Sequence, residues 1–262
     1  MTAPRPCWLR SACFSIGMIL ATVVWAPLSV LTLPLPYRTR YELITAWAAF
    51  VLWWLRLTCK IETEVQGREN LPDQPAVVLC QHQSTWETLF LTQVFRPQVW
   101  VLKRELLWVP FFGWAIALLR PIAINRLAGR SAMRQVLAQG TERLRDGCYV
   151  VVFPEGTRVA PGERRRHAVG GALLATHSGA PVVPIAHNAG RCWPRRRFLK
   201  HPGKIRVVIG ELIPTTELKS EELRAQVQAW MEETSRAIDS ADQWSERAAG
   251  IPRSGAGDEP RV

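Results

Sequence analysis

A histidine and a glutamate five residues apart, His82 and Glu87, are the residues of this chain best placed to do chemistry. They follow an apolar run, 76–80, that is typical of a buried strand. Ser84 and Glu87 also match the capping-box pattern, which predicts that a helix begins here. Side chains in the first turn of a helix lean back toward its N-terminus, so we expect Glu87 to reach the loop that holds His82. A carboxylate that orients a histidine makes a general base near neutral pH, and the alternative is that Glu87 only caps its helix.

A second candidate segment, Pro-Glu-Gly-Thr-Arg at 154–158, follows the apolar run 149–153 directly. Pro154 ends strand pairing, and Gly156 permits a tight turn with close approach of a ligand. The planar guanidinium of Arg158 suits a phosphate group. Taken alone, the segment could equally be an ordinary turn with a solvated arginine.

Alternating apolar and amphipathic stretches predict the elements that position these residues. We expect strands near 60–65, 76–80, 99–102, 121–124, 149–153, 182–185 and 205–209, and helices near 85–94, 131–145, 168–177 and 221–238. This alternation indicates one α/β domain over 59–240, with a mostly covered mixed sheet flanked by helices. Ligands of such sheets collect at the carboxyl ends of strands, where Lys103 and Arg126 also fall, so we expect these cations to meet His82 in one cleft.

The first 58 residues have a different composition, and we interpret them as a membrane-anchoring helical hairpin. Ser11 to Leu33 is a run of 23 residues without a charge, which is long enough to span a bilayer. A secretory signal is the alternative, but the run is too long and no cleavage site follows it. A second apolar run, 43–55, has 13 residues, so it suits a re-entrant or interfacial helix. At the other end, 241–262 is rich in Gly, Ser, Pro and charge, and we expect it to be disordered.

The charge balance calls for an anionic partner. The 262-residue chain has a net charge of +11, and 155–210 holds eleven Lys or Arg residues against two acidic ones. Nucleic acid is not the expected partner, because we find neither interleaved surface aromatics nor a helix-turn-helix pattern. The arginine triplets at 164–166 and 195–197 suit anionic lipid or an acidic carrier protein, or are solvated loops. The six cysteines show no metal-ligand spacing and are expected to be free thiols. The histidines other than His82 lack an evident acid partner and are expected to be structural or exposed.

The two candidate segments together resemble the glycerolipid acyltransferase family. That family has a histidine followed after four residues by an acid, and later a block similar to Phe153–Arg158. The stretch from Lys103 to Arg126 is similar to the family's second block, and 183–186 is similar to its fourth. The blocks occur in order, and the similarity covers roughly residues 60 to 215.

The resemblance implies transfer of a fatty acyl group from acyl-CoA or acyl carrier protein to the sn-2 hydroxyl of 1-acylglycerol 3-phosphate (lysophosphatidic acid). His82 is then the general base and Glu87 orients it, while Arg158, helped by Lys103 or Arg126, binds the acceptor phosphate. Glu155, Gly156 and Thr157 would shape that phosphate site. The reaction needs no cofactor and no metal, because the acyl donor is itself a substrate. Membrane lipid is a further partner, and the expected location is a bacterial inner membrane with the catalytic domain on its cytoplasmic face.

Three alternatives stay open at this stage. The acceptor could be glycerol 3-phosphate or an amino-lipid, because these share the chemistry. The family most often has aspartate where this chain has Glu87, so the chain could be a non-catalytic lipid-binding relative. A hydrolase is less well supported, because the sequence has no G-x-S-x-G nucleophile motif.

Overall fold

The computed structural model describes residues 6–248, with side chains placed at 7–125 and 127–240. Within this range seven strands form one sheet in the order β1-β7-β6-β2-β5-β3-β4, and only the pair β6–β7 is antiparallel. The strands are β1 (Ile61–Gln66), β2 (Val77–Cys80), β3 (Gln98–Lys103), β4 (Ile122–Ile124), β5 (Tyr149–Val152), β6 (Val182–His187) and β7 (Gly203–Ile209). The mixed α/β sheet expected from the sequence is therefore confirmed.

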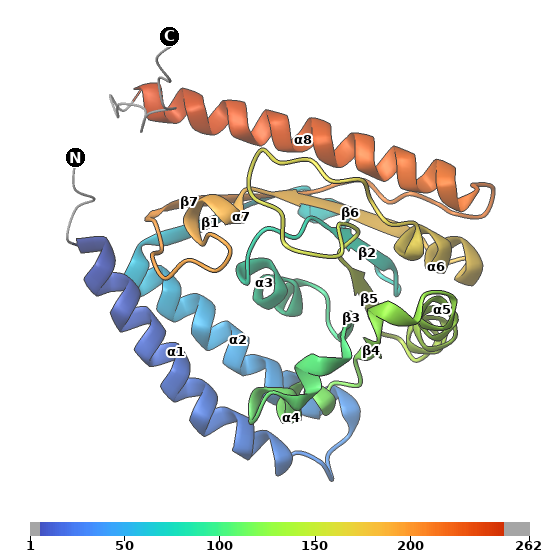
Figure 1. Cartoon of the computed structure of the whole chain (residues 1–262), viewed down its shortest axis with the longest axis horizontal. Coiled ribbons are helices and arrows are strands. Elements are labelled where there is room, and N and C mark those ends of the chain that lie inside the picture. Colours follow the sequence, from blue (N-terminus) through green and yellow to red (C-terminus); the bar gives the residue numbers. More distant parts are fainter. Residues whose placement is uncertain (1–5, 249–262) are drawn as a thin grey trace.

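Helices cover both faces of this sheet (Figure 1). The helices are α1 (Pro6–Val30), α2 (Tyr37–Cys59), α3 (Trp86–Val94), α4 (Phe112–Ala117), α5 (Arg130–Arg145), α6 (Gly170–Ser178), α7 (Ala189–Cys192) and α8 (Ser220–Ala248), with short 3₁₀ helices η1 (Arg68–Asn70), η2 (Arg104–Trp108) and η3 (Arg126–Ala128). In β2, Val78 and Cys80 pack toward α2 and α3, whereas Val77 and Leu79 pack toward α5, α6 and α8. Apolar side chains on both faces explain why this strand is a continuous apolar run.

The central strand β2 lies between β5 and β6, and all three are parallel. Leu79 is level with Val152 of β5 and Pro184 of β6. Because parallel strands end at the same edge of a sheet, the segments that follow these three strands emerge side by side. The sheet order thus brings together stretches of chain that are about 70 and 100 residues apart.

The N-terminal hairpin consists of two long helices, and the second is longer than its 13-residue apolar run. Polar and apolar residues on both flanks continue α2, so it has 23 residues, and α1 has 25. Both helices are long and apolar enough to cross a membrane, with mean hydropathies of 1.9 and 1.2. They also pack on the domain: Ser11 Oγ accepts a hydrogen bond from the Lys200 amide at 2.9 Å, and the Phe14 ring meets Trp193 edge-on. The hairpin is therefore fixed to the α/β domain.

The last helix, α8, runs past the boundary that the sequence predicted. We expected disorder from residue 241, but α8 continues to Ala248. The stretch 220–249 contains no glycine or proline, and the first such residue is Gly250. Nothing in the local composition therefore stops the helix at 241. The rest of the expected tail, 249–262, lies outside the described residues.

Candidate active site

The loop between β2 and α3 brings the side chains of His82 and Glu87 together. His82 Nδ1 lies 2.8 Å from Glu87 Oε1. Because a carboxylate only accepts hydrogen bonds, Nδ1 carries the proton and donates it. The lone pair of Nε2 is then available to take a proton. The contact predicted from the spacing is confirmed, and it selects the tautomer that a general base needs.

Glu87 caps the start of α3 as well as orienting His82. Its Oε1 accepts hydrogen bonds from the backbone amides of Gln83 at 3.0 Å and Ser84 at 2.8 Å. The Ser84 hydroxyl accepts from the Trp86 amide at 3.2 Å. The two roles that the sequence allowed for Glu87 therefore coexist in one carboxylate.

Burial and hydrogen bonding act in opposite directions on Glu87. The residue is only 1% exposed, and burial alone would raise its pKa. The hydrogen bonds from the His82 ring and the Ser84 amide outweigh that effect, so the pKa lies below its ordinary value. Glu87 is consequently a buried carboxylate at neutral pH, and a buried negative charge can stabilise a protonated His82 ring.

The segment that follows β5 holds His82 from three sides. The Phe153 ring stacks on the imidazole, with 4.1 Å between ring centroids. Glu155 Oε1 accepts a hydrogen bond from the His82 amide at 3.4 Å, and the Val159 amide donates to the His82 carbonyl at 2.7 Å. The same segment carries Arg158, so the base and the predicted phosphate ligand are parts of one structural unit.

Glu155 contacts the backbone of His82, and it is not among the described residues that line the cavity of Arg158. It lines a cavity of about 110 Å³ together with Gln81, His187 and residues of α8. Burial raises its pKa to about 7, and its Oε2 has no hydrogen-bond partner among the described residues. The sequence resemblance implied a substrate contact, whereas the observed contacts support the backbone of His82.

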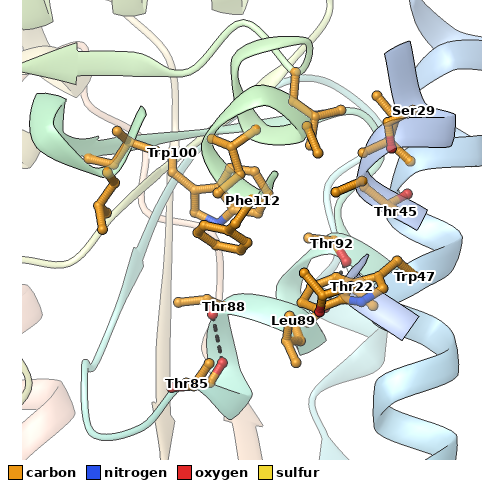
Figure 2. Close-up of a pocket in the computed structure, with 18 of the residues that line it drawn as sticks. Thr22, Ser29, Thr45, Trp47, Thr85, Thr88, Leu89, Thr92, Trp100 and Phe112 are labelled. Atoms are coloured by element: carbon orange, nitrogen blue, oxygen red, sulfur yellow. Dashed lines mark hydrogen bonds between the residues drawn. The ribbon is translucent and has the colours of Figure 1, made fainter. Parts of the chain in front are cut away.

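A larger cavity of about 250 Å³ lies in front of His82. Its charged or titratable lining residues are His82, Lys103 and Arg158. Its other walls come mainly from α1, α2, α3 and α4 and are mostly apolar. The apolar and aromatic lining residues include Trp25, Trp47, Leu89, Trp100, Phe112 and Leu119, and hydroxyl groups come from Thr22, Ser29, Thr45, Thr85 and Thr88. Several of these residues are labelled in Figure 2. A base, two cations and an apolar wall suit an amphipathic ligand with an anionic group.

The predicted cations are Arg158, Lys103 and Arg126, and the first two differ in burial and in their contacts. Arg158 is half-buried, its Nε has no hydrogen-bond partner in the part of the chain that the structure describes, and burial lowers its pKa. Lys103 is 53% exposed and lies 3.3 Å from Glu105. Arg126 begins η3, and its side chain lies outside the described residues. Of these three, Arg158 has the strongest unmet demand for an anion, because a buried cation needs a partner.

Gly156 and Thr157 shape the turn that leads to Arg158. Gly156 has φ +68°, a left-handed conformation that strains any residue with a Cβ. Among the described side chains that line the two cavities, neither residue appears.

Comparisons with known proteins show the family of this chain. Residues 62–188 match the family described as Acyltransferase. A 1-acyl-sn-glycerol-3-phosphate acyltransferase of Pseudomonas aeruginosa is 45% identical over 238 residues, which cover 88% of this chain and 91% of that protein. The chain belongs to the acyltransferase family.

Two further comparisons extend this result. A chloroplastic 1-acyl-sn-glycerol-3-phosphate acyltransferase of Brassica napus is 29% identical over 213 residues, 77% of this chain and 60% of that protein. The crystal structure of the 1-acyl-sn-glycerophosphate acyltransferase PlsC of Thermotoga maritima superposes with a TM-score of 0.75 at 22% identity, covering 89% of this chain and 96% of that one. The likeness to that structure shows that the fold is shared.

His187 is the residue of this acyltransferase site that the sequence did not single out. It ends β6, and its Nε2 lies 4.0 Å from Glu87 Oε2. Nε2 donates to the Gln81 carbonyl at 2.9 Å, while Nδ1 accepts from the Ala189 amide at 3.2 Å, so the ring is neutral. Burial lowers its pKa, consistent with this pattern. No acid partner of His187 was evident from the sequence, because Glu87 is a hundred residues earlier in the chain.

Proposed function

We propose that this acyltransferase moves a fatty acyl group from a thioester, acyl-CoA or acyl carrier protein, to the sn-2 hydroxyl of 1-acylglycerol 3-phosphate, giving phosphatidic acid for phospholipid synthesis. One observation carries the proposal: a Glu87-oriented His82 lines the same largely apolar cavity as Arg158, whose Nε has no hydrogen-bond partner among the described residues. The P. aeruginosa relative has this activity in its name.

The proposed mechanism uses His82 twice. Nε2 takes the proton of the acceptor hydroxyl as its oxygen attacks the thioester carbonyl. Glu87 stabilises the imidazolium that forms. When the tetrahedral intermediate collapses, the C–S bond breaks and the imidazolium returns the proton to the thiolate sulfur. The acceptor hydroxyl is itself the nucleophile, so no acyl-enzyme forms and no cofactor takes part.

Arg158 is the proposed phosphate ligand. Its guanidinium matches phosphate geometry, and its Nε has no hydrogen-bond partner among the described residues. Lys103 lines the same cavity and adds a second positive charge. The apolar wall built by α1 to α4 then binds an acyl chain of the substrate. This set of contacts favours an acceptor that carries both a phosphate and an acyl chain over glycerol 3-phosphate, which has no chain.

The geometry of His82 and Glu87 does not support the alternative that the chain is a non-catalytic lipid-binding relative. It depended on Glu87 being unable to serve His82, and the 2.8 Å hydrogen bond shows that it reaches the ring. An intact base beside an unpaired arginine supports catalysis.

The apolar hairpin supports membrane association, and we propose that α1 and α2 lie in one leaflet. The first turns of α1 contact the chain near Lys200, and the same helix lines the main cavity with Trp25 and Ser29. A helix held by the domain along its length cannot project away from it across the bilayer. The six free cysteines suit a reducing compartment. We propose that the catalytic domain lies on the cytoplasmic face of a bacterial inner membrane, which the reducing compartment and the bacterial relative support.

Purified protein with labelled acyl-CoA or acyl carrier protein tests the proposal. We expect phosphatidic acid from lysophosphatidic acid, at a higher rate than products from glycerol 3-phosphate or an amino-lipid. His82→Ala should abolish transfer and keep the melting temperature, and Arg158→Ala should raise KM for lysophosphatidic acid more than for the donor. Preferential acylation of another acceptor, or near-normal turnover by the His82 variant, would overturn it.

A further inference from the structure

A basic loop beside the first turns of α1 carries exposed arginines to which the proposed mechanism assigns no step. This headgroup loop, residues 194–200, connects α7 to β7 (Figure 1) and carries three consecutive arginines. Arg195 turns inward and donates to the Arg158 carbonyl. Arg196 and Arg197 are exposed and have no carboxylate partner among the described residues. Two cations are therefore available to an outside anion.

The headgroup loop is fixed to α1, so the height of its arginines along that helix is set by the fold. The Phe198 and Trp8 rings lie 6.0 Å apart and remain 46% and 58% exposed. The Lys200 amide donates to Ser11 Oγ, and Lys200 Nζ lies 5.6 Å from the centre of the Phe198 ring. Exposed aromatic rings next to arginine are typical of the membrane–water interface.

The apolar surface that begins at this aromatic pair continues along α1. The helix exposes Leu9, Ile16, Ile19, Leu20, Val23, Val24 and Leu28. A helix that buries such a face in acyl chains places the side chains at its rim among the phosphates. Arg196 and Arg197 are next to Phe198 in the chain, so they lie at that rim.

We propose that the headgroup loop, with Trp8, binds anionic phospholipid headgroups and holds the first turns of α1 at the membrane surface. The exposed Phe198–Trp8 pair and the apolar face of α1 favour lipid over an acidic carrier protein, which would use the arginines alone. The proposal rests on membrane association and does not depend on the identity of the acyl acceptor.

Vesicle binding by the full-length protein tests this proposal without substrate. We compare vesicles of phosphatidylcholine with vesicles that also contain phosphatidylglycerol, using Arg196→Gln with Arg197→Gln. The matched control is Arg165→Gln with Arg166→Gln, which removes the same charge from another exposed loop. Each arginine near an anionic surface contributes about fivefold, so we expect about a 25-fold loss of binding to phosphatidylglycerol vesicles. Binding to phosphatidylcholine should not change, and about 1 M salt should remove the difference.

The control pair and two activity measurements decide between explanations. An equal loss for both arginine pairs would overturn the proposal, because net charge alone would then explain binding. Unchanged vesicle binding with a higher KM for acyl carrier protein alone would also overturn it and assign the loop to carrier docking. Acyl transfer from acyl-CoA in detergent should be unchanged in the Arg196/Arg197 variant, and a loss there would place the loop in the chemistry instead. Phe198→Ala should weaken binding to both vesicle types.

Discussion

Glu87 has a longer side chain than the aspartate usual at this position in the family pattern, and the start of α3 uses the extra length. Its carboxylate reaches His82 Nδ1 and the Ser84 amide at 2.8 Å each. Removing one methylene would retract the carboxylate by about 1.5 Å, which is half of a hydrogen-bond distance. The position at which α3 begins therefore puts the longer glutamate side chain within hydrogen-bond distance of His82.

Replacing Glu87 by glutamine tests the charge separately from the geometry. The amide oxygen can still accept from His82 Nδ1, but it cannot stabilise the imidazolium. We expect kcat to fall by about 10³-fold or more with little change in KM. Glu87→Asp keeps the charge and should lose less. Steady-state kinetics with lysophosphatidic acid measures both, and a glutamine variant with normal kcat would contradict the role of the charge.

The raised pKa of Glu155 makes the stability of the protein depend on pH. The native state keeps the proton up to about pH 7, whereas the unfolded chain releases it near its ordinary pKa of 4.5. The native state thus binds more protons than the unfolded chain in this window, so the free energy of unfolding falls as pH rises. Glu155→Gln cannot ionise, and its stability relative to wild type should grow between about pH 5 and pH 7, by about 3 kcal/mol at most.

Thermal unfolding in detergent across this pH range measures the Glu155 effect. Above about pH 8 the difference between variant and wild type should be constant. Glu155→Gln also keeps an acceptor for the His82 amide, whereas Glu155→Leu does not. We therefore expect the leucine variant to have a lower kcat with little change in KM. If only the KM for lysophosphatidic acid rose, Glu155 would instead belong to the phosphate site.

At the scale of elements, local contacts were predictable from the sequence, and so was the meeting of His82, Lys103 and Arg158 in one cavity, whereas the other long-range contacts were not. His82 and Glu87 share one strand-to-helix turn, so spacing and capping chemistry were enough to pair them. The contacts of His82 with Glu155, and of Glu87 with His187, depend on β5 and β6 lying on either side of β2. No local pattern specifies that strand order. The apolar runs predicted most strands and helices, whereas the short α7 has too few residues to show a period.

The cavity wall formed by α2 offers a test of where acyl chain binds. Ala48 lines the cavity, and Ala49 next to it on the same helix is exposed. Ala48→Phe fills part of the roughly 250 Å³ space, so transfer with long acyl chains should fall about tenfold relative to short ones. Ala49→Phe is the matched control and should not change the preference. Rates measured with donors and acceptors of different chain length show which substrate uses this wall, and equal effects on short and long chains would contradict the assignment.

At the scale of the whole molecule, one side is apolar and the opposite side is polar. The apolar side runs along α1 and α2 and continues onto the segment after β3, where Trp108, Phe111 and Trp114 are exposed. The amphipathic α8 covers the other face of the sheet (Figure 1). The sequence predicted an anchoring hairpin, but its attachment to the domain depends on tertiary contacts that composition does not encode.

A charge placed on the apolar side should release the protein from membranes. Leu20 on α1 is 60% exposed, and a charged side chain within the hydrocarbon costs about 3 kcal/mol. Leu20→Glu should therefore lower vesicle binding by about 100-fold and leave transfer in detergent unchanged. Ala225→Glu, at an exposed position of α8, is the control and should bind normally. Equal binding by both variants would show that α1 does not enter the bilayer.

The position of α1 also governs how product leaves. Phosphatidic acid keeps the phosphate and the first acyl chain of the acceptor, so the groups that bind the substrate also retain the product. Trp25 and Ser29 of α1 line the cavity, while Val24 and Leu28 of the same helix are exposed on the apolar side. A single helix thus separates the cavity from the exposed apolar surface that we propose lies in the bilayer. The two-chain product can then pass from the cavity into the adjacent lipid. We expect sustained turnover to depend on a lipid or detergent phase next to α1.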